Sequence, residues 1–370
     1  MTKFIPEPIS KVCYGLGDYP SEDSYSSSEG RIIIPIAGMD TRALLLSDDN
    51  GVTFRREDIE YSRRPPQKFR ELSDGSFMAL GIMSIYQDFY YDRDADADYP
   101  YGLAVYRAKT FDDILNDKVT VDFCPVHIPG LRFGYGDSGN RHTGFITGWR
   151  ELSNGDILAT AYGQLKDDKT VCPYFKDNRD YVFYLYRTWT VVSHDKGKTW
   201  EFGCTVADCQ TYPLPDNNAE GYCEADVEET EPGKLTCILR SQGHEIFAPM
   251  YVCRSEDYGK TWTAPEKMCD WGVLPRILKM KDGTLVCASG HLHTMLIFSD
   301  DDGKTWSEPF ICEECDGLWG DSATGYTSVY ESRPGEITIV YADPKDGIAE
   351  NAPDGKKRKV YSKTYKINKA

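Results

Sequence analysis

The sequence predicts an all-β protein, and in particular a six-bladed β-propeller. Three observations support this fold class: a tight-turn motif that recurs along the chain, six hairpin-like segments that each turn at a glycine, and an almost complete lack of helical periodicity. At 370 residues the chain is long enough for one large all-β domain. We therefore expect residues 1–370 to form a single propeller domain, with long loop insertions around residues 82–105 and 163–183.

The recurring motif is S-x-D-x-G-x-T-W. It occurs as SHDKGKTW (193–200), SEDYGKTW (255–262) and SDDDGKTW (299–306), with a weaker copy, SDDNGVTF, at 47–54. The aspartate carboxylate can accept hydrogen bonds from N–H groups of its own turn, and the glycine supplies a positive φ. The threonine and the aromatic residue then begin the next strand. We interpret the motif as a structural turn whose aspartates have no catalytic part.

Six further glycines lie between pairs of apolar segments that have the pattern of a β-hairpin. These are Gly30, Gly75, Gly155, Gly233, Gly283 and Gly335. In four of the first five units the S-x-D-x-G-x-T-W motif follows downstream, so each unit has about four strands. Six four-stranded units arranged radially form a six-bladed propeller. The C-terminal segment KVYSKTYKIN alternates like a strand, and we expect it to pair with residues near the N-terminus and close the propeller.

Composition and charge exclude several classes of function. The net charge of −17 argues against a nucleic-acid or membrane partner. No apolar stretch is long enough to span a membrane, and the segment MTKFIPEPISKVCYG lacks the features of a secretory signal. Twelve cysteines without an export signal are typical of reduced thiols in the cytosol. We therefore expect a cytoplasmic protein without disulfides between its blades, and no cofactor.

Hairpin geometry indicates which residues reach the face opposite to the glycine turns. With a rise of about 3.3 Å per residue, seven to ten residues on either side of a turn glycine span a strand. Five polar residues lie at such offsets, two before a glycine and three after one: Glu224, Tyr326, Arg240, His291 and Asp40. Because propellers usually bind ligands at that face, these side chains are candidates for a binding or catalytic site.

The S-x-D-x-G-x-T-W motif is the Asp box typical of sialidases and their relatives, and nearly the whole chain resembles this superfamily. The segment YCEADVEETEPGKLTCILRS matches a sialidase pattern in which an arginine, here Arg240, follows a glutamate, here Glu224, sixteen residues later. The resemblance implies that Tyr326, in GYTSVYESRPGEITIVY, is a nucleophile with Glu224 as its base. It also implies that Asp40, in AGMDTRALLLS, is the acid/base residue of a retaining glycosidase.

The sequence departs from the sialidase pattern in its arginines. Sialidases hold the substrate carboxylate with three arginines, and only Arg240 has a clear counterpart here. His291 or His293 occupies the place of the third arginine, and we expect these histidines to contact the substrate. Other arginines are candidate replacements: Arg31, Arg42, Arg63, Arg64, Arg141 and Arg276. No third ligand lies at a suitable spacing from the two histidines, so no metal site is predicted.

Two classes of function follow. The leading hypothesis is a sialidase-like retaining exo-glycosidase that removes a terminal, acidic, sialic-acid-like sugar from a small oligosaccharide or glycoside, with a different acidic sugar or a neutral one left open. The alternative is a non-catalytic carbohydrate- or protein-binding propeller, since Asp boxes also occur in such proteins. Glu224, Arg240 and Tyr326 together favour the enzyme, and the missing arginines favour the binder or an altered specificity. No feature of the sequence indicates an oligomeric state.

Overall fold

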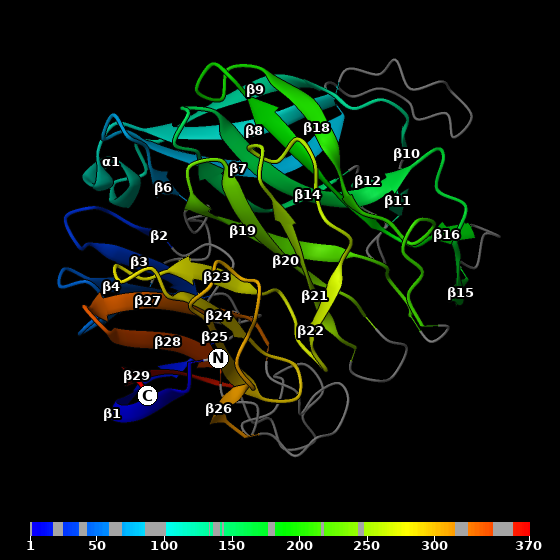
Figure 1. Ribbon diagram of the computed structural model, residues 1–370. Coiled ribbons are helices and arrows are strands. Elements are labelled where there is room, and N and C mark those ends of the chain that lie inside the picture. Colours follow the sequence, from blue (N-terminus) through cyan, green and yellow to red (C-terminus); the bar gives the residue numbers. More distant parts are fainter. Residues whose placement is uncertain are drawn as a thin grey trace. The chain divides into compact units, whose positions relative to one another are not determined.

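The protein is built almost entirely of β-strands. The structure, a computed structural model, describes residues 2–17, 25–36, 43–58, 69–85, 101–132, 134–135, 141–142, 144–176, 182–215, 218–242, 248–314, 325–342 and 358–370. In these ranges it has 29 strands and a single short helix, α1 (Phe111–Leu115) (Figure 1). The predicted all-β class is confirmed, and no described helix is long and apolar enough to cross a membrane.

Four sheets contain four strands each, and every neighbouring pair in them is antiparallel. One has the order β2 (Tyr25–Ser26), β3 (Ile32–Ile36), β4 (Ala43–Ser47), β5 (Arg55–Asp58). Another has the order β19 (Cys223–Glu231), β20 (Lys234–Arg240), β21 (Met250–Ser255), β22 (Glu266–Cys269). The next has the order β23 (Arg276–Lys279), β24 (Leu285–Ser289), β25 (Thr294–Ser299), β26 (Phe310–Glu313). The last has the order β27 (Thr327–Arg333), β28 (Glu336–Ala342), β29 (Lys359–Lys369), β1 (Phe4–Leu16).

A larger sheet combines two further groups of four strands. The first group is β6 (Arg70–Glu71), β7 (Phe77–Ile85), β8 (Tyr101–Ala108) and β9 (Thr120–His127). The second is β13 (Phe145–Glu151), β14 (Ile157–Leu165), β17 (Arg187–Ser193) and β18 (Trp200–Ala207). Parallel pairing of β18 with β9, at Trp200 and Val126, joins the groups. The sheet also includes β10 (Leu131–Arg132), which pairs with the far end of β14.

The two predicted insertions contain strands where the structure describes them. In the first insertion, strand β7 continues to Ile85 and β8 begins at Tyr101. Residues 86–100 lie outside the described residues. In the second insertion, β15 (Val171–Lys176) pairs with β16 (Val182–Tyr184) as a small hairpin. A further short pair is β11 (Gly134–Tyr135) with β12 (Arg141–His142).

All six predicted turn glycines lie between the first two strands of a four-stranded group. Their φ angles fall between +77° and +88°, a region that only glycine adopts without steric cost. The hairpins predicted around these glycines are therefore confirmed.

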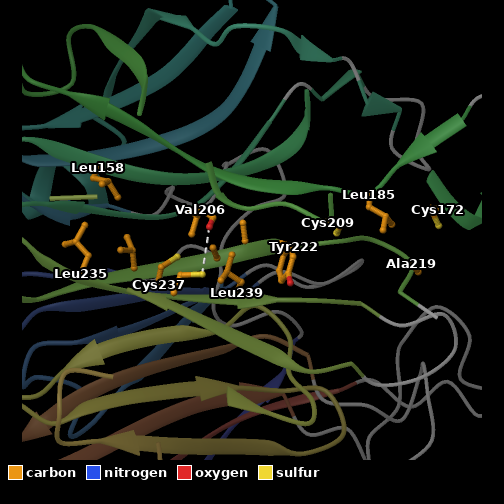
Figure 2. Packing of buried hydrophobic residues seen from close by; sticks show 14 of the residues in the cluster. Leu158, Cys172, Leu185, Val206, Cys209, Ala219, Tyr222, Leu235, Cys237 and Leu239 are labelled. Carbon is orange, nitrogen blue, oxygen red and sulfur yellow. Dashed lines mark hydrogen bonds between the residues drawn. The ribbon is translucent and has the colours of Figure 1, made fainter. Parts of the chain in front are cut away.

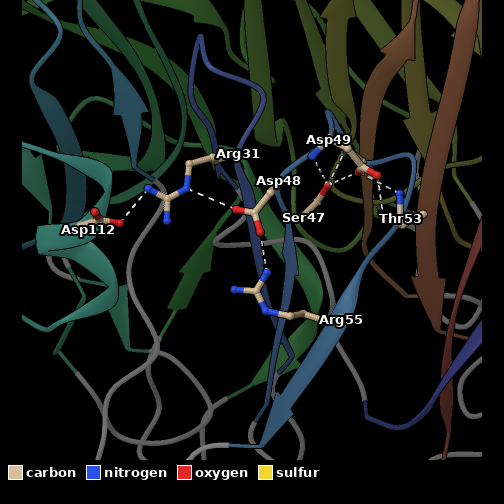
Figure 3. Close-up of polar contacts among 8 residues, drawn as sticks. Arg31, Ser47, Asp48, Asp49, Thr53, Arg55 and Asp112 are labelled. Atoms are coloured by element: carbon tan, nitrogen blue, oxygen red, sulfur yellow. Dashed lines mark hydrogen bonds and ion pairs between the residues drawn. The ribbon is translucent and has the colours of Figure 1, made fainter.

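The four Asp boxes form tight turns between the third and fourth strands of their groups. In the box at 255–262, Asp257 accepts hydrogen bonds from the Ser255 hydroxyl at 2.8 Å and from the Thr261 amide and hydroxyl at 2.9 and 2.6 Å. The Trp262 indole N–H donates to the Gly259 carbonyl at 3.2 Å. Figure 3 shows the corresponding aspartate bonds in the first box, from Ser47 and Thr53 to Asp49. The aspartates shape these turns, as the motif predicts.

The two ends of the chain pair with each other, as predicted. Strand β1 runs antiparallel to β29 from Phe4 opposite Lys369 to Leu16 opposite Lys359. Glu313 of β26 reinforces this arrangement with contacts to Lys11 of β1 at 2.8 Å and to Lys363 of β29 at 2.9 Å. The Tyr341 hydroxyl also donates to Glu313, at 2.8 Å. A largely buried carboxylate thus links the N-terminal strand to the C-terminal strand.

The chain divides into two compact units. The first comprises Met1–Ala79, Arg107–Val119 and Trp271–Ala370, and the second comprises Leu80–Tyr106 and Thr120–Asp270. In the second unit, side chains of β14 and β18 pack on those of β20 and β21 (Figure 2). Leu158, Val206, Cys237 and Leu239 lie in this core, and each is at most 3% exposed. In the first unit, separate apolar clusters surround Phe298 and Ile34.

Eleven cysteines lie in the described residues, and all of them are free thiols. Burial raises the pKa of Cys209 and Cys253 to about 12. These thiols belong to the apolar core of the second unit, where they pack as small hydrophobic side chains.

The Asp-box interpretation gives a first prediction. Asp257→Ala removes the acceptor of three hydrogen bonds, and we expect the free energy of unfolding to fall by about 1–3 kcal/mol. The matched control is Glu256→Ala, which removes an exposed carboxylate from the same turn. Urea denaturation of both variants measures the difference. Equal stability of the two variants would show that the Asp257 carboxylate does not hold the turn.

The contacts of Glu313 give a second prediction. Burial raises the pKa of Glu313, but hydrogen bonds from Lys11, Lys363 and Tyr341 outweigh this effect and lower the pKa from 4.5 to about 2. The resulting stability is present above pH 4.5 and is lost as the pH falls towards 2. We expect Glu313→Gln to be less stable than the parent by about 1–2 kcal/mol at pH 7, and the difference to shrink below pH 4.

Urea denaturation at pH 7, 5, 4 and 3 measures this pH dependence. The control is Glu314→Gln, the same substitution at the adjacent, exposed residue. A difference between Glu313→Gln and the parent that stays constant from pH 7 to pH 3 would contradict the prediction.

Candidate functional site

Glu224 and Arg240 lie side by side at the end of the β19–β20 hairpin that is opposite to the Gly233 turn. Cys223 pairs with Arg240 in the register of these two strands. The Glu224 Oε1 and Arg240 Nη1 atoms are 2.6 Å apart, and each residue is only 7% exposed. Two residues that are sixteen positions apart in the sequence therefore form a buried ion pair, because the chain folds back at Gly233.

The backbone of Glu224 has an unusual conformation. Its φ is +43°, in the left-handed region that residues with a Cβ rarely adopt. The register of β19 shifts between Cys223 and Asp226, so that Glu224 and Ala225 form a bulge in the strand. Bulges and left-handed residues both redirect side chains, and both are frequent at functional sites.

The Arg240 guanidinium contacts further polar side chains. Its Nη2 group donates to the side-chain carbonyl of Gln242 and lies 3.9 Å from a Glu220 carboxylate oxygen. Together with Glu224, these partners fix the orientation of the guanidinium plane. A guanidinium held in one plane is suited to bind a carboxylate or a sugar hydroxyl in a defined geometry.

Tyr162 of β14 is a residue of this site that the sequence analysis missed. Burial raises the pKa of its hydroxyl well above the usual value, and the negative charge of Glu224 raises it further. The Tyr162 ring packs edge-on against Tyr186, with ring centroids 5.2 Å apart. Tyr162 lies seven residues after Gly155, the same offset that separates Arg240 from Gly233, so the offset rule could have identified it.

Close backbone contact fixes the segment that leads into β19. The Tyr186 amide donates to the Glu220 carbonyl at 2.6 Å, and the Tyr222 amide donates to the Tyr186 carbonyl at 3.1 Å. Gly221, between these partners, has a φ of +91°, and a Cβ at this position would lie 2.4 Å from the Tyr186 carbonyl oxygen. Only glycine fits there, and this contact sets the position from which β19 begins.

The other predicted site residues within the described ranges lie in the first unit. Tyr326 directly precedes β27 and is partly buried. His291 and His293 lie between β24 and β25, and the His293 ring packs edge-on against Trp271 with centroids 6.0 Å apart. Asp40 lies outside the described residues. The pairing of Tyr326 with Glu224 and the roles of all these residues stay predictions.

The arginines proposed as replacements differ in their surroundings. Arg31 lies next to the Gly30 turn, where it bonds to Asp48 at 3.3 Å and to Asp112 at 2.7 Å (Figure 3). Its guanidinium also stacks 4.3 Å from the centre of the Phe111 ring of α1. Arg31 therefore has a structural role at the end of its sheet where the turn glycine lies. This position disfavours Arg31 as a ligand-binding residue.

Among the remaining candidates, Arg276 begins β23 and is partly buried, and Arg141 belongs to β12. Arg42, Arg63 and Arg64 lie outside the described residues. Within the described ranges, no group of three or more His, Cys, Asp or Glu side chains is arranged to hold a metal ion.

Comparison with solved structures identifies the class of fold. The chain is similar to the NanB sialidase of Streptococcus pneumoniae, in a mutant form, with a TM-score of 0.56 and 12% identity over 95% of this chain and 70% of that one. It is also similar to a protein of unknown function from Dyadobacter fermentans, with a TM-score of 0.66 and 18% identity over 98% and 99% of the two chains. The fold is therefore sialidase-like.

The family follows from the sequence match. The BNR repeat-like domain family matches residues 150–339, which is more than half of the chain. The chain belongs to this family, and its predicted assignment to the sialidase and BNR-repeat superfamily is confirmed. A search of curated proteins gave no match.

The close contact at Gly221 gives a third prediction. Gly155→Ala introduces a Cβ into open space at a positive φ, and should lower the free energy of unfolding by about 1–2 kcal/mol. Gly221→Ala carries the same backbone cost and in addition forces β19 away from Tyr186, so we expect a loss of about 3 kcal/mol or more. Urea denaturation compares the two variants. Similar losses would contradict the conclusion that Gly221 is required by close packing.

Proposed function

We propose that the protein is a sialidase-like retaining exo-glycosidase that acts on a terminal, acidic, sialic-acid-like sugar. The observation that carries this proposal is the buried Glu224–Arg240 pair, in which Glu224 is held in a left-handed conformation within a sialidase-like fold. As part of the same proposal, the six four-stranded groups form the six blades of a propeller. The site then lies at the strand ends opposite to the turn glycines.

The proposed reaction has two steps. The Tyr326 oxygen attacks the anomeric carbon and Glu224 takes its proton, while the glycosidic bond breaks and Asp40 protonates the departing oxygen. In the second step, Asp40 removes a proton from water, the water oxygen attacks the anomeric carbon, and the tyrosine oxygen leaves and regains its proton from Glu224. Configuration at the anomeric carbon is retained because it is inverted twice.

A tyrosine nucleophile suits a sugar that carries a carboxylate on its anomeric carbon. An anionic aspartate or glutamate nucleophile would be repelled by that carboxylate, whereas a tyrosine hydroxyl is neutral until it attacks. Arg240, with His291 and His293, would hold the substrate carboxylate and hydroxyl groups. The Glu220 and Gln242 contacts of Arg240 support this role because they fix the guanidinium in one plane.

The second candidate function is a non-catalytic carbohydrate- or protein-binding propeller. The surroundings of Arg240 favour this function. The arginine already has three protein partners, Glu224, Glu220 and Gln242, as a purely structural ion pair would. For the enzyme we propose a small glycoside or oligosaccharide as substrate. Under either function we propose no nucleic-acid or membrane partner, because the chain has a net charge of −17. A cytoplasmic location is proposed from the twelve cysteines.

A screen of aryl glycosides distinguishes these functions. The substrates are 4-nitrophenyl glycosides of sialic acid, other ulosonic acids, uronic acids and common neutral sugars, and the readout is release of nitrophenol. Hydrolysis of an acidic glycoside supports the proposal, and hydrolysis of neutral ones alone corrects the substrate class. Measurable binding of a sugar by calorimetry without any hydrolysis would favour the second function.

The mechanism gives a fourth prediction. Tyr326→Phe removes one hydroxyl, so folding should be unaffected while kcat falls by about three orders of magnitude or more. Glu224→Gln should have a similar effect because the proton acceptor is lost. Asp40→Ala should spare kcat/KM for substrates with good leaving groups, such as nitrophenyl glycosides, and lower kcat/KM for those with alkyl leaving groups, because only the latter need an acid in the first step.

Two controls accompany these variants. Tyr251→Phe removes a hydroxyl from another partly buried tyrosine, and Glu231→Gln removes the charge from a different ion pair on β19, between Glu231 and Lys234. Both should keep activity near the parent level. If Tyr326→Phe retains more than about a tenth of the parent kcat, Tyr326 is not the nucleophile.

A further inference from the structure

We infer that two threonines of the neighbouring strands, Thr147 and Thr160, are positioning residues that hold Glu224 in its left-handed conformation. The inference rests on the proposed function only for its activity readout, because the structural part concerns the conformation of Glu224 itself. Both threonines and Glu224 lie in the second unit.

The bulge of β19 is a place where the backbone needs an external restraint. Left-handed φ values cost free energy for any residue with a Cβ, and the first residue of such a bulge is often glycine. Here that position holds Glu224, with a φ of +43°. A costly conformation persists only where surrounding contacts determine it.

Two hydrogen bonds to a single atom, the Ala225 carbonyl oxygen, provide this restraint. The Thr147 hydroxyl donates to the Ala225 carbonyl oxygen at 2.6 Å, and the Thr160 hydroxyl donates to the same oxygen at 2.8 Å. Ala225 is the second residue of the bulge, so these bonds fix the peptide plane between Ala225 and Asp226, at the end of the bulge that Glu224 begins. Thr160 is fully buried and Thr147 is 6% exposed, so both bonds are shielded from water.

Close approach of the strands makes these bonds possible. Thr147 itself lies in a register shift of β13, between Ile146 and Gly148. A Cβ at Gly148 would lie 2.3 Å from the Asp226 Oδ1 atom and 2.9 Å from its Cα, so glycine is needed where β13 meets β19. The bulges of β13 and β19 therefore face each other. The β13 bulge supplies the Thr147 hydroxyl, which donates a hydrogen bond to the Ala225 carbonyl in the β19 bulge.

Bonds on both sides of the bulge keep it in place. The Thr188 hydroxyl donates to the Tyr222 carbonyl at 3.1 Å, before the bulge. After the bulge, Arg150 contacts Asp226 at 3.3 Å. Because the Tyr222 and Ala225 carbonyls are both held, the short segment from Cys223 to Ala225 has little freedom to rotate, and this restrains the φ of Glu224. The Glu224 carboxylate consequently points at Arg240, and loss of the threonine hydroxyls should release it.

The structural test is a comparison of glycine and alanine at position 224. Both Glu224→Gly and Glu224→Ala lack the carboxylate, but only glycine tolerates a positive φ, so we expect Glu224→Gly to unfold at a higher urea concentration. In a background that carries both Thr147→Val and Thr160→Val, the β19 bulge can relax, and the higher stability of Glu224→Gly over Glu224→Ala should disappear. In a Thr190→Val background this difference in stability should persist.

Thr190→Val is a matched control because the Thr190 hydroxyl is also fully buried and bonds to Cys204, at 3.1 Å to its amide. If the double background does not fold, the same comparison is made with Thr147→Val alone, where the advantage should shrink. An advantage of glycine that is unchanged without the threonine hydroxyls, or absent in the parent, overturns the inference.

The activity test asks whether the hydroxyl groups matter to the reaction. Thr147→Val and Thr160→Val should each lower kcat/KM by about 10- to 100-fold, because a small displacement of a catalytic group is costly. Thr147→Ser and Thr160→Ser keep the hydroxyl and should restore activity to within about threefold of the parent. Thr190→Val should leave it near the parent value.

The two tests separate the inference from the proposed function. If the parent hydrolyses no glycoside, the proposed function fails, while the glycine–alanine comparison still decides whether the threonines hold Glu224. If the parent is active and the serine variants are no more active than the valine variants, the hydroxyls do not position the base and the inference is wrong.

Discussion

The need for a positive φ at defined positions shapes every four-stranded group described in this protein. Between the first two strands the position is a glycine, and its conformation has no steric cost. In each Asp box two successive residues have positive φ, and the first of them is not glycine: Asn50, Lys196, Tyr258 and Asp302. There the serine and aspartate side chains of the motif supply hydrogen bonds that offset the backbone cost. Both kinds of turn therefore need a positive φ. The hairpin turns achieve it with a glycine, and the Asp boxes achieve it with side-chain hydrogen bonds.

Glu224 extends this principle to the candidate site. It has a positive φ without being glycine, and its own segment has no Asp-box motif to support it. The supporting bonds come from Thr147 and Thr160, about 65 to 78 residues earlier in the chain. A turn that is stabilised by its own motif is local, whereas the orientation of Glu224 depends on how two sheets of the second unit pack together. This difference explains why the Asp boxes recur nearly unchanged while the site has no repeat.

Side chains at strand ends serve different purposes in the two units. In the first unit, Glu313 links β1 to β29 and so secures the pairing of the two chain ends. Arg31 joins a turn to the short helix α1, which lies between β8 and β9, where four of the other groups have an Asp box. In the second unit, by contrast, charged groups are buried together at the end of a hairpin, around Arg240. Buried charges are costly unless they are paired, and such pairing at a strand end is more typical of a binding site than of a turn.

The sequence alone determined the hairpins, the Asp-box turns, the pairing of the chain ends and the nearness of Glu224 to Arg240. These features depend on local patterns: alternation of apolar residues, glycine at turns, and the fixed rise of a strand. Only the tertiary structure decided the parallel junction of β18 with β9 and the partners of Arg31 and Ala225. Those features depend on contacts between strands that are far apart in the chain. The alternation of residues within one strand predicts which side chains face inwards. It does not predict which side chains from distant strands they contact.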